Sequence, residues 1–191
     1  MPSDQPGYAC AFQPVSGLTL HYLTDSVYLF AKLVCTTPLC TAGGSQHWLS
    51  VGFPIQAGAM TGATAVIGAA SSGVRLYDLN ARSLAAVIPL HSSWQTLMGT
   101  SYASENNGIT TLTFRKELIE AGLDGMSRVT PLRPNQSPSN LIFAVGPGTG
   151  LSYHTVRVSA TVWLGFVGET PPPANPPLNP PWLPDPTPPP P

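Results

Sequence analysis

The stretch LTLHYLTDSVYLFAKLV, residues 18–34, indicates the fold class of this 191-residue chain. Apolar side chains alternate with polar or aromatic ones over residues 18–23, and Thr-Asp-Ser follows at residues 24–26. A second β-branched and aromatic run occupies residues 27–34. Alternation with a period of two, interrupted by a short polar turn, is typical of a β-hairpin. The stretch therefore predicts two paired antiparallel strands.

Short runs of the same kind recur along the chain, separated by Gly, Pro, Ser or Asn. They occupy residues 48–53, 64–67, 74–79, 99–104, 109–114, 141–145 and 155–166. A short helix is predicted only at residues 116–122, and no β-α-β alternation is visible. Nine or ten strands at this spacing indicate an antiparallel sandwich or barrel. We expect an all-β protein, an immunoglobulin-like antiparallel β-sandwich of two sheets with a Pro-rich C-terminal tail.

Proline divides the chain into two parts. Of the 23 prolines, 13 lie in the last 21 residues. Residues 1–170 have the size and the apolar content of one domain with one core. Residues 171–191 have the composition of a polyproline II linker or stalk, which has no core of its own.

Charge is sparse and nearly balanced, with 17 charged residues and a formal net charge of −1. A nucleic-acid-binding protein needs a basic excess to neutralise phosphates, so we expect no nucleic-acid partner. No charge occurs between Lys32 and Arg75. Residues 51–74 nevertheless contain Pro54 and several glycines, which argues against a membrane span. This uncharged Gly/Ala-rich stretch is better explained by backbone lying close to something large and apolar.

The three cysteines, Cys10, Cys35 and Cys40, are too few for a disulfide-dense framework. Cys35 and Cys40 enclose a short turn-like segment and form a candidate disulfide, whereas Cys10 could pair with either of them across neighbouring strands. A disulfide indicates an oxidising compartment. No basic segment followed by an apolar run opens the chain, so no signal peptide is seen here.

Motifs for common enzyme chemistry are missing from the sequence. It contains neither a phosphate-binding glycine loop with its lysine nor a nucleophile elbow, and its carboxylates are scattered singly. Three histidines, His21, His47 and His91, are expected to be surface or hydrogen-bonded residues, with His47 facing solvent. From these absences we expect no enzyme of these classes.

Met60 and His154 have more distinctive surroundings. Met60 lies in a charge-free, Gly-rich segment, and His154 follows Gly-Pro-Gly-Thr-Gly at residues 146–150. A methionine in such a loop usually fills a packing gap. Imidazole and thioether are, however, also a known axial pair for haem iron.

Several segments resemble the DOMON family, and in particular its haem-binding members such as the cytochrome domain of cellobiose dehydrogenase. The resemblance spans roughly residues 8–168. It rests on the order of its pieces and on a methionine that lies early among them and a histidine at their end. The pieces are WLSVGF at residues 48–53, MTGATAVIG at 60–68, VRLYDL at 74–79, NGIT at 107–110, FR at 114–115, FAVG at 143–146 and YH at 153–154.

The resemblance implies a β-sandwich that holds one non-covalent haem b with six-coordinate iron. Its axial metal ligands carry over onto Met60 and His154. The expected donors to the haem propionates are Arg75, Tyr77, Tyr153 and Arg157. Such a domain transfers single electrons, and its redox partner would be a flavin domain, a polysaccharide monooxygenase, ascorbate or a transmembrane cytochrome.

Two other functions stay open at this point. Similar sandwiches also occur as modules thought to bind ligands without haem, so a haem-free carbohydrate-binding or adhesion module is the alternative. A structural extracellular domain on a Pro-rich stalk is the third. We expect the chain to be secreted or displayed at the cell surface. The reasons are the location that the resemblance implies, the candidate disulfide and the Pro-rich tail.

Overall fold

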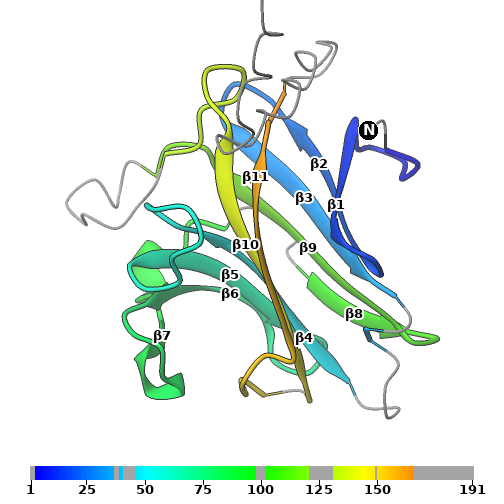
Figure 1. Cartoon of the computed structure of the whole chain (residues 1–191), viewed down its shortest axis with the longest axis vertical. Helices are drawn as coiled ribbons and strands as arrows, with labels where there is room; N and C mark the ends of the chain where they lie inside the picture. Colours follow the sequence, from blue (N-terminus) through cyan, green and yellow to red (C-terminus); the bar gives the residue numbers. More distant parts are fainter. Residues whose placement is uncertain are drawn as a thin grey trace, which may run out of the picture.

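A computed structural model of the chain describes residues 3–36, 39–40, 46–97, 102–120, 131–148 and 150–165 (Figure 1). Two antiparallel β-sheets face each other in this structure. The expected all-β, two-sheet sandwich is therefore confirmed. The predicted stalk at residues 171–191 lies outside the described residues.

The first sheet contains five strands and includes the hairpin predicted from residues 18–34. Its order is β1 (Cys10–Val15), β2 (Leu18–Thr24), β3 (Tyr28–Cys35), β9 (Ile109–Glu117) and β8 (Tyr102–Asn106). Asp25 closes the β2–β3 turn, because its carboxylate accepts hydrogen bonds from the backbone N–H groups of Val27 and Tyr28.

The second sheet contains six strands, two 3₁₀ turns lie near its edge, and the candidate site lies on this sheet. Its order is β11 (Val156–Val162), β10 (Ser139–Pro147), β4 (His47–Phe53), β5 (Ala63–Ala69), β6 (Gly73–Leu79) and β7 (Val87–Pro89). The turns are η1 (Leu84–Ala86) and η2 (Ser92–Trp94).

The main hydrophobic core fills the space between the sheets. On β3, Leu29, Ala31, Leu33 and Cys35 are fully buried and alternate with partly exposed residues. This period of two is what a strand with one buried face requires. Leu49, Val51 and Phe53 of β4 meet the same core from the opposite sheet.

Strands β4 and β5 differ from the others because every residue in them is buried. One face of each strand packs into the main core. The other face belongs to a second, smaller apolar cluster, which we call the outer cluster; its buried members are Trp48, Ala63, Ala65, Ile67, Ala69, Leu79 and Ala144. The six-stranded sheet is thus covered on its outer face at its central strands β4 and β5, and nearby loops shape the candidate site.

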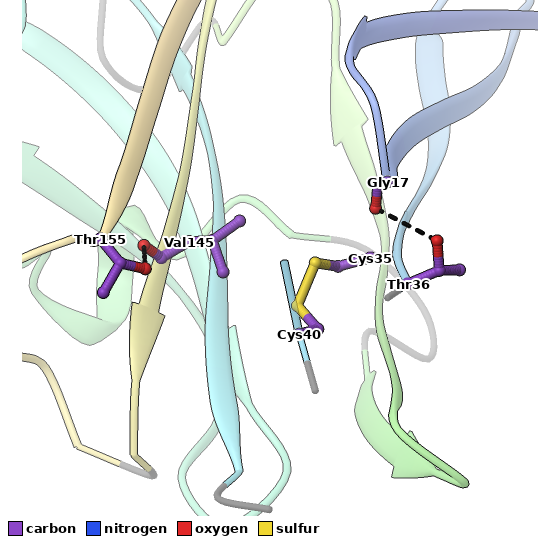
Figure 2. Close-up of a disulfide and its surroundings, with 6 residues drawn as sticks. All are labelled: Gly17, Cys35, Thr36, Cys40, Val145 and Thr155. Carbon is purple, nitrogen blue, oxygen red and sulfur yellow. Dashed lines mark hydrogen bonds between the residues drawn. A yellow bond between two sulfur atoms is a disulfide. The ribbon is translucent and has the colours of Figure 1, made fainter. Parts of the chain in front are cut away.

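The disulfide joins Cys35 at the end of β3 to Cys40, and Cys10 is a free cysteine (Figure 2). The sequence left open whether Cys35 pairs with Cys40 or Cys10 pairs with one of them, and the structure pairs Cys35 with Cys40. Thr36 lies between the two half-cystines, and its backbone N–H donates to the carbonyl of Gly17 at 2.8 Å. Both half-cystines are buried in the main core.

Two expectations are wrong. The predicted helix at residues 116–122 does not form over its described part, because Lys116 and Glu117 complete β9. Buried Phe114, Lys116 and Leu118 continue the period of two, and buried Lys116 forms a 2.9 Å ion pair with buried Glu120. His47 is buried and does not face solvent. Within the described residues, no helix is long and apolar enough to cross a membrane.

Candidate functional site

Small side chains line the outer face of the six-stranded sheet. Strand register places Ala144 of β10, Ser50 of β4 and Ile67 of β5 in one row across the sheet. Ile142, Gly52 and Ala65 form the next row. Gly52 and Ala144 add little height to the sheet, so they leave a low surface on which another group can lie close to the backbone.

A pocket with a volume of about 270 Å³ lies over this surface. That volume is close to the lower end of the range for small-molecule sites, about 300–1,000 Å³. The wall combines residues of the strands with residues of three loops that fold over them. It is made by Trp48, Ser50, Gly52, Met60, Ile67, Leu79, Arg82, Ser83, Leu84, Val87, Ile142, Ala144, Leu151, Ser152, Tyr153, His154 and Arg157.

Met60 reaches the pocket from the β4–β5 loop, residues 54–62. Two glycines with positive φ, Gly58 (73°) and Gly62 (81°), allow this loop to turn sharply, since glycine adopts such angles without strain. The N–H of Gly62 donates to the carbonyl of Leu79 at 2.8 Å, and the N–H of Ala63 donates to the carbonyl of Met60 at 3.2 Å. Met60 is partly buried and packs against the outer cluster.

His154 reaches the pocket from the β10–β11 loop, residues 148–155. The residue after it, Thr155, is held by two hydrogen bonds to the carbonyl of Val145, from its N–H at 2.8 Å and its hydroxyl at 3.2 Å. Figure 2 shows the hydroxyl bond, with the side chain of Val145 pointing toward the disulfide. The backbone beside His154 is therefore tied to the main core.

A second connection holds the same loop from the pocket side. The indole N–H of Trp48 donates to Ser152 Oγ at 3.1 Å, and the Ser152 hydroxyl donates to the carbonyl of Pro147 at 2.9 Å. Trp48 can lie against the strand because Gly146 is opposite it; a Cβ on Gly146 would be 2.2 Å from the indole ring. Ser152 is two residues from His154, so this chain of hydrogen bonds restrains the segment that carries the imidazole.

The two loops approach the pocket from opposite ends of the sheet. The β4–β5 loop follows Phe53 at one end of β4, whereas β10 ends at Pro147, opposite His47 at the other end of β4. In Figure 1 the β10–β11 loop is at the bottom of the molecule, and the β4–β5 loop is at the far end of β4. Met60 and His154 thus flank the pocket from two sides.

Four of the six predicted site residues line this pocket: Met60, Tyr153, His154 and Arg157. The other two are not among its lining residues. Tyr77 packs against the outer cluster, and Arg75 is an exposed residue of β6 whose partner on β5 is Ile67. Both therefore share the sheet face with the pocket but lie to one side of it.

Arg82 lines the pocket and was not predicted. It lies between β6 and β7, in a segment with no motif that marks it as a site residue. Arg82 and Arg157 are both exposed, and among the described residues no carboxylate lines the pocket. The site is an apolar pocket with two guanidinium groups, one imidazole and one thioether.

No cluster of three or more His, Cys, Asp or Glu side chains suited to a metal ion occurs within the described residues. A thioether paired with one imidazole is not a cluster of that type. One setting in which an imidazole and a thioether bind a metal as a pair is haem, where a macrocycle fills the other positions. Comparison of the chain with known proteins finds no family model that matches it and no matching curated protein.

Proposed function

We propose that this chain is a b-type cytochrome domain of the DOMON kind, which carries single electrons through a haem held between Met60 and His154. The observation that carries the proposal is that these two residues flank one apolar pocket from opposite ends of the sheet. The resemblance to haem-binding DOMON domains identifies the same two residues independently of their position in the fold.

The residues at the pocket fit a haem. The low surface made by Gly52 and Ala144 gives a flat macrocycle room to lie close to the sheet. Imidazole nitrogen and thioether sulfur are established axial donors to haem iron. Arg82 and Arg157 are available to the two propionate groups, because guanidinium groups pair strongly with carboxylates.

A haem bound here would supply a one-electron couple, and Met60 and His154 would be the residues that hold its iron. A thioether ligand in place of a second imidazole raises the reduction potential. The apolar wall of Ile67, Leu79 and Ile142 limits the access of water, which is a further influence on the potential.

The proposal places the domain in a secreted or cell-surface redox chain. The Cys35–Cys40 disulfide supports an oxidising compartment. The donor and acceptor are proposed to be a flavin domain, a polysaccharide monooxygenase, ascorbate or a transmembrane cytochrome.

The test is a titration of the purified full-length chain with haem, followed by absorbance. Wild-type protein should bind one equivalent and give low-spin b-type bands after reduction with dithionite. His154→Ala and Met60→Leu should each give a high-spin spectrum or lose haem. Met60→Leu removes the sulfur with little change of volume, and His91→Ala is the matched control because His91 is exposed and outside the pocket.

Two results would decide against the proposal. A wild-type chain that leaves the haem spectrum unchanged would favour a haem-free module, for example one that binds carbohydrate. Unaltered low-spin spectra in both ligand variants would mean that haem is held by other residues.

A further inference from the structure

The charged residues of this nearly neutral chain are distributed unequally between the two sheets. The five-stranded sheet, with residues 3–9, its connecting turns and residues 118–120, carries four carboxylates whose side chains the structure describes and three cations. The six-stranded sheet, with the three loops at the pocket, carries three arginines and one aspartate. Among the described side chains, the side of the six-stranded sheet is therefore basic, whereas the side of the five-stranded sheet is close to balanced.

All three arginines of the basic side are exposed, whereas its single carboxylate is buried. Asp78 is two residues after Leu76, which packs in the main core, so both side chains lie on the inner face of β6. Arg75, Arg82 and Arg157 are exposed. The side of the sheet that carries the pocket therefore presents positive charge without an exposed carboxylate in the described part of these elements.

Strand register places two of these arginines at the ends of one row across the pocket surface. Arg157 of β11 pairs with Ala144, and Arg75 of β6 pairs with Ile67. Only Ala144, Ser50 and Ile67 lie between them. Four strand spacings of about 4.8 Å separate the ends of the row, or roughly 19 Å. Arg82 contributes a third positive charge from the loop over this surface.

Large apolar side chains are exposed at the same place. Leu84, Leu151 and Tyr153 line the pocket and are 40%, 37% and 67% exposed. An apolar patch within a charged rim is the usual anatomy of a protein-docking surface. The three arginines and these three residues together are called the pocket rim below.

We infer that the pocket rim is the docking surface for an acidic protein partner, whose carboxylates flank a small apolar patch. The inference deepens the proposed function, since this partner is the electron donor or acceptor. A positive surface attracts and orients an acidic partner before contact and raises its association rate. Exposed charges add little affinity each, so the complex is expected to be weak and transient.

Haem bound in the pocket would not remove the positive surface entirely. Its two propionates offset the charges of Arg82 and Arg157, which line the pocket. Arg75 lies outside the lining and keeps its charge. Arg75 is therefore the most informative residue for testing docking apart from haem binding.

The probe is an acetylated, amidated hexapeptide with two aspartates on each side of a Leu-Trp pair. It is added to the ¹⁵N-labelled full-length chain, first haem-free and then loaded, and amide shifts are followed at low and high salt. We expect shifts at residues 75, 82–84 and 151–157 that shrink as salt is added. Arg75→Gln and Arg82→Gln should each weaken binding about twofold to fivefold. Lys32→Gln removes the same charge from the five-stranded sheet and should have no such effect.

Several outcomes would overturn the inference: no binding of the peptide, shifts centred on the five-stranded sheet, or equal weakening by Lys32→Gln and Arg75→Gln. Self-association of the chain through the rim, seen by analytical ultracentrifugation and lost in Arg75→Gln, would overturn it as well, because a second copy would then be the occupant. The haem-free arm needs no cofactor, so failure of docking and failure to bind haem are observed separately.

Discussion

Gly146 is the residue that lets Trp48 lie flat against β10. An added Cβ would be 2.2 Å from the indole ring, so Gly146→Ala must displace Trp48 and with it the donor to Ser152. Overpacking of this kind costs about 1–3 kcal/mol of unfolding free energy. Chemical denaturation should show that loss in Gly146→Ala.

Gly52→Ala is the matched control, because it adds the same methyl group to the same sheet face. There the nearest atom, the Cβ of Ile142, would be 3.5 Å from the new Cβ, an ordinary contact. We expect Gly52→Ala to be the more stable variant. Equal stability of the two variants would contradict the described packing of Trp48 on Gly146.

His21 gives stability a dependence on pH. It is buried on β2, its Nδ1 is 2.9 Å from Ser3 Oγ, and Asp4 is 3.6 Å away. Burial lowers the pKa of His21 below its ordinary value of 6.5, although Asp4 partly opposes the shift. The unfolded chain then binds this proton more readily than the folded chain. Stability from this group is therefore complete above about pH 6.5 and is lost as the pH falls through the folded pKa.

The measurement compares denaturation midpoints at about pH 7 and about pH 5 for the wild type and His21→Gln. The wild type should lose more stability on acidification than the variant, which has no imidazole to protonate. An equal loss in both proteins would show that His21 does not contribute to the acid sensitivity.

At this scale the sequence predicted two of the residues that line the pocket but not all of their neighbours. Met60 and His154 were selected mainly through the resemblance to haem-binding DOMON domains, because a Gly-rich segment beside a methionine or a histidine is by itself a weak signal. Arg82 could not be predicted, since its place at the pocket depends on how the segment after β6 folds over the sheet. Arg75 and Tyr77 were chosen by nearness in sequence, and neither is among the residues that line the pocket.

At the scale of elements, the β10–β11 loop is fixed by contacts that we expect to act together. Trp48→Phe removes the indole N–H together with part of the ring that lies on Gly146, whereas Ser152→Ala removes the acceptor. A net hydrogen bond contributes about 0.5–1.5 kcal/mol. Each single variant should accelerate amide hydrogen exchange at Thr155, which follows His154.

The double variant completes the cycle. If the Trp48–Ser152 bond is the shared interaction, Trp48→Phe/Ser152→Ala should exchange no faster than Ser152→Ala alone. Strictly additive effects would mean that the two residues act on the loop independently.

Elements with local signals were predicted best. The β2–β3 hairpin has alternation and a turn signal within 17 residues, so its sequence contains most of the information needed. The helix expected at residues 116–122 failed because the buried Lys116–Glu120 pair looks in sequence like a polar helical turn. Only tertiary burial shows that Lys116 belongs to a strand.

The whole molecule is a sandwich in which the two central strands β4 and β5 of one sheet are buried on both faces. The charge-free stretch between Lys32 and Arg75, which contains β4 and β5, led us to expect only that this backbone lies close to something large and apolar. The sequence could not indicate which loops cover the outer face, because that depends on which segments meet at one pocket, such as those of Met60 and His154, some 90 residues apart. The gathering of exposed arginines on the side of the six-stranded sheet likewise becomes visible only with the strand order.

The most direct test of the central claim is X-ray absorption spectroscopy at the iron edge on the haem-loaded full-length chain. The account predicts one sulfur neighbour of iron in the wild type, no sulfur in Met60→Leu, and a sulfur that persists in Arg75→Gln. A wild-type iron without sulfur, or a sulfur signal that survives Met60→Leu, would contradict it.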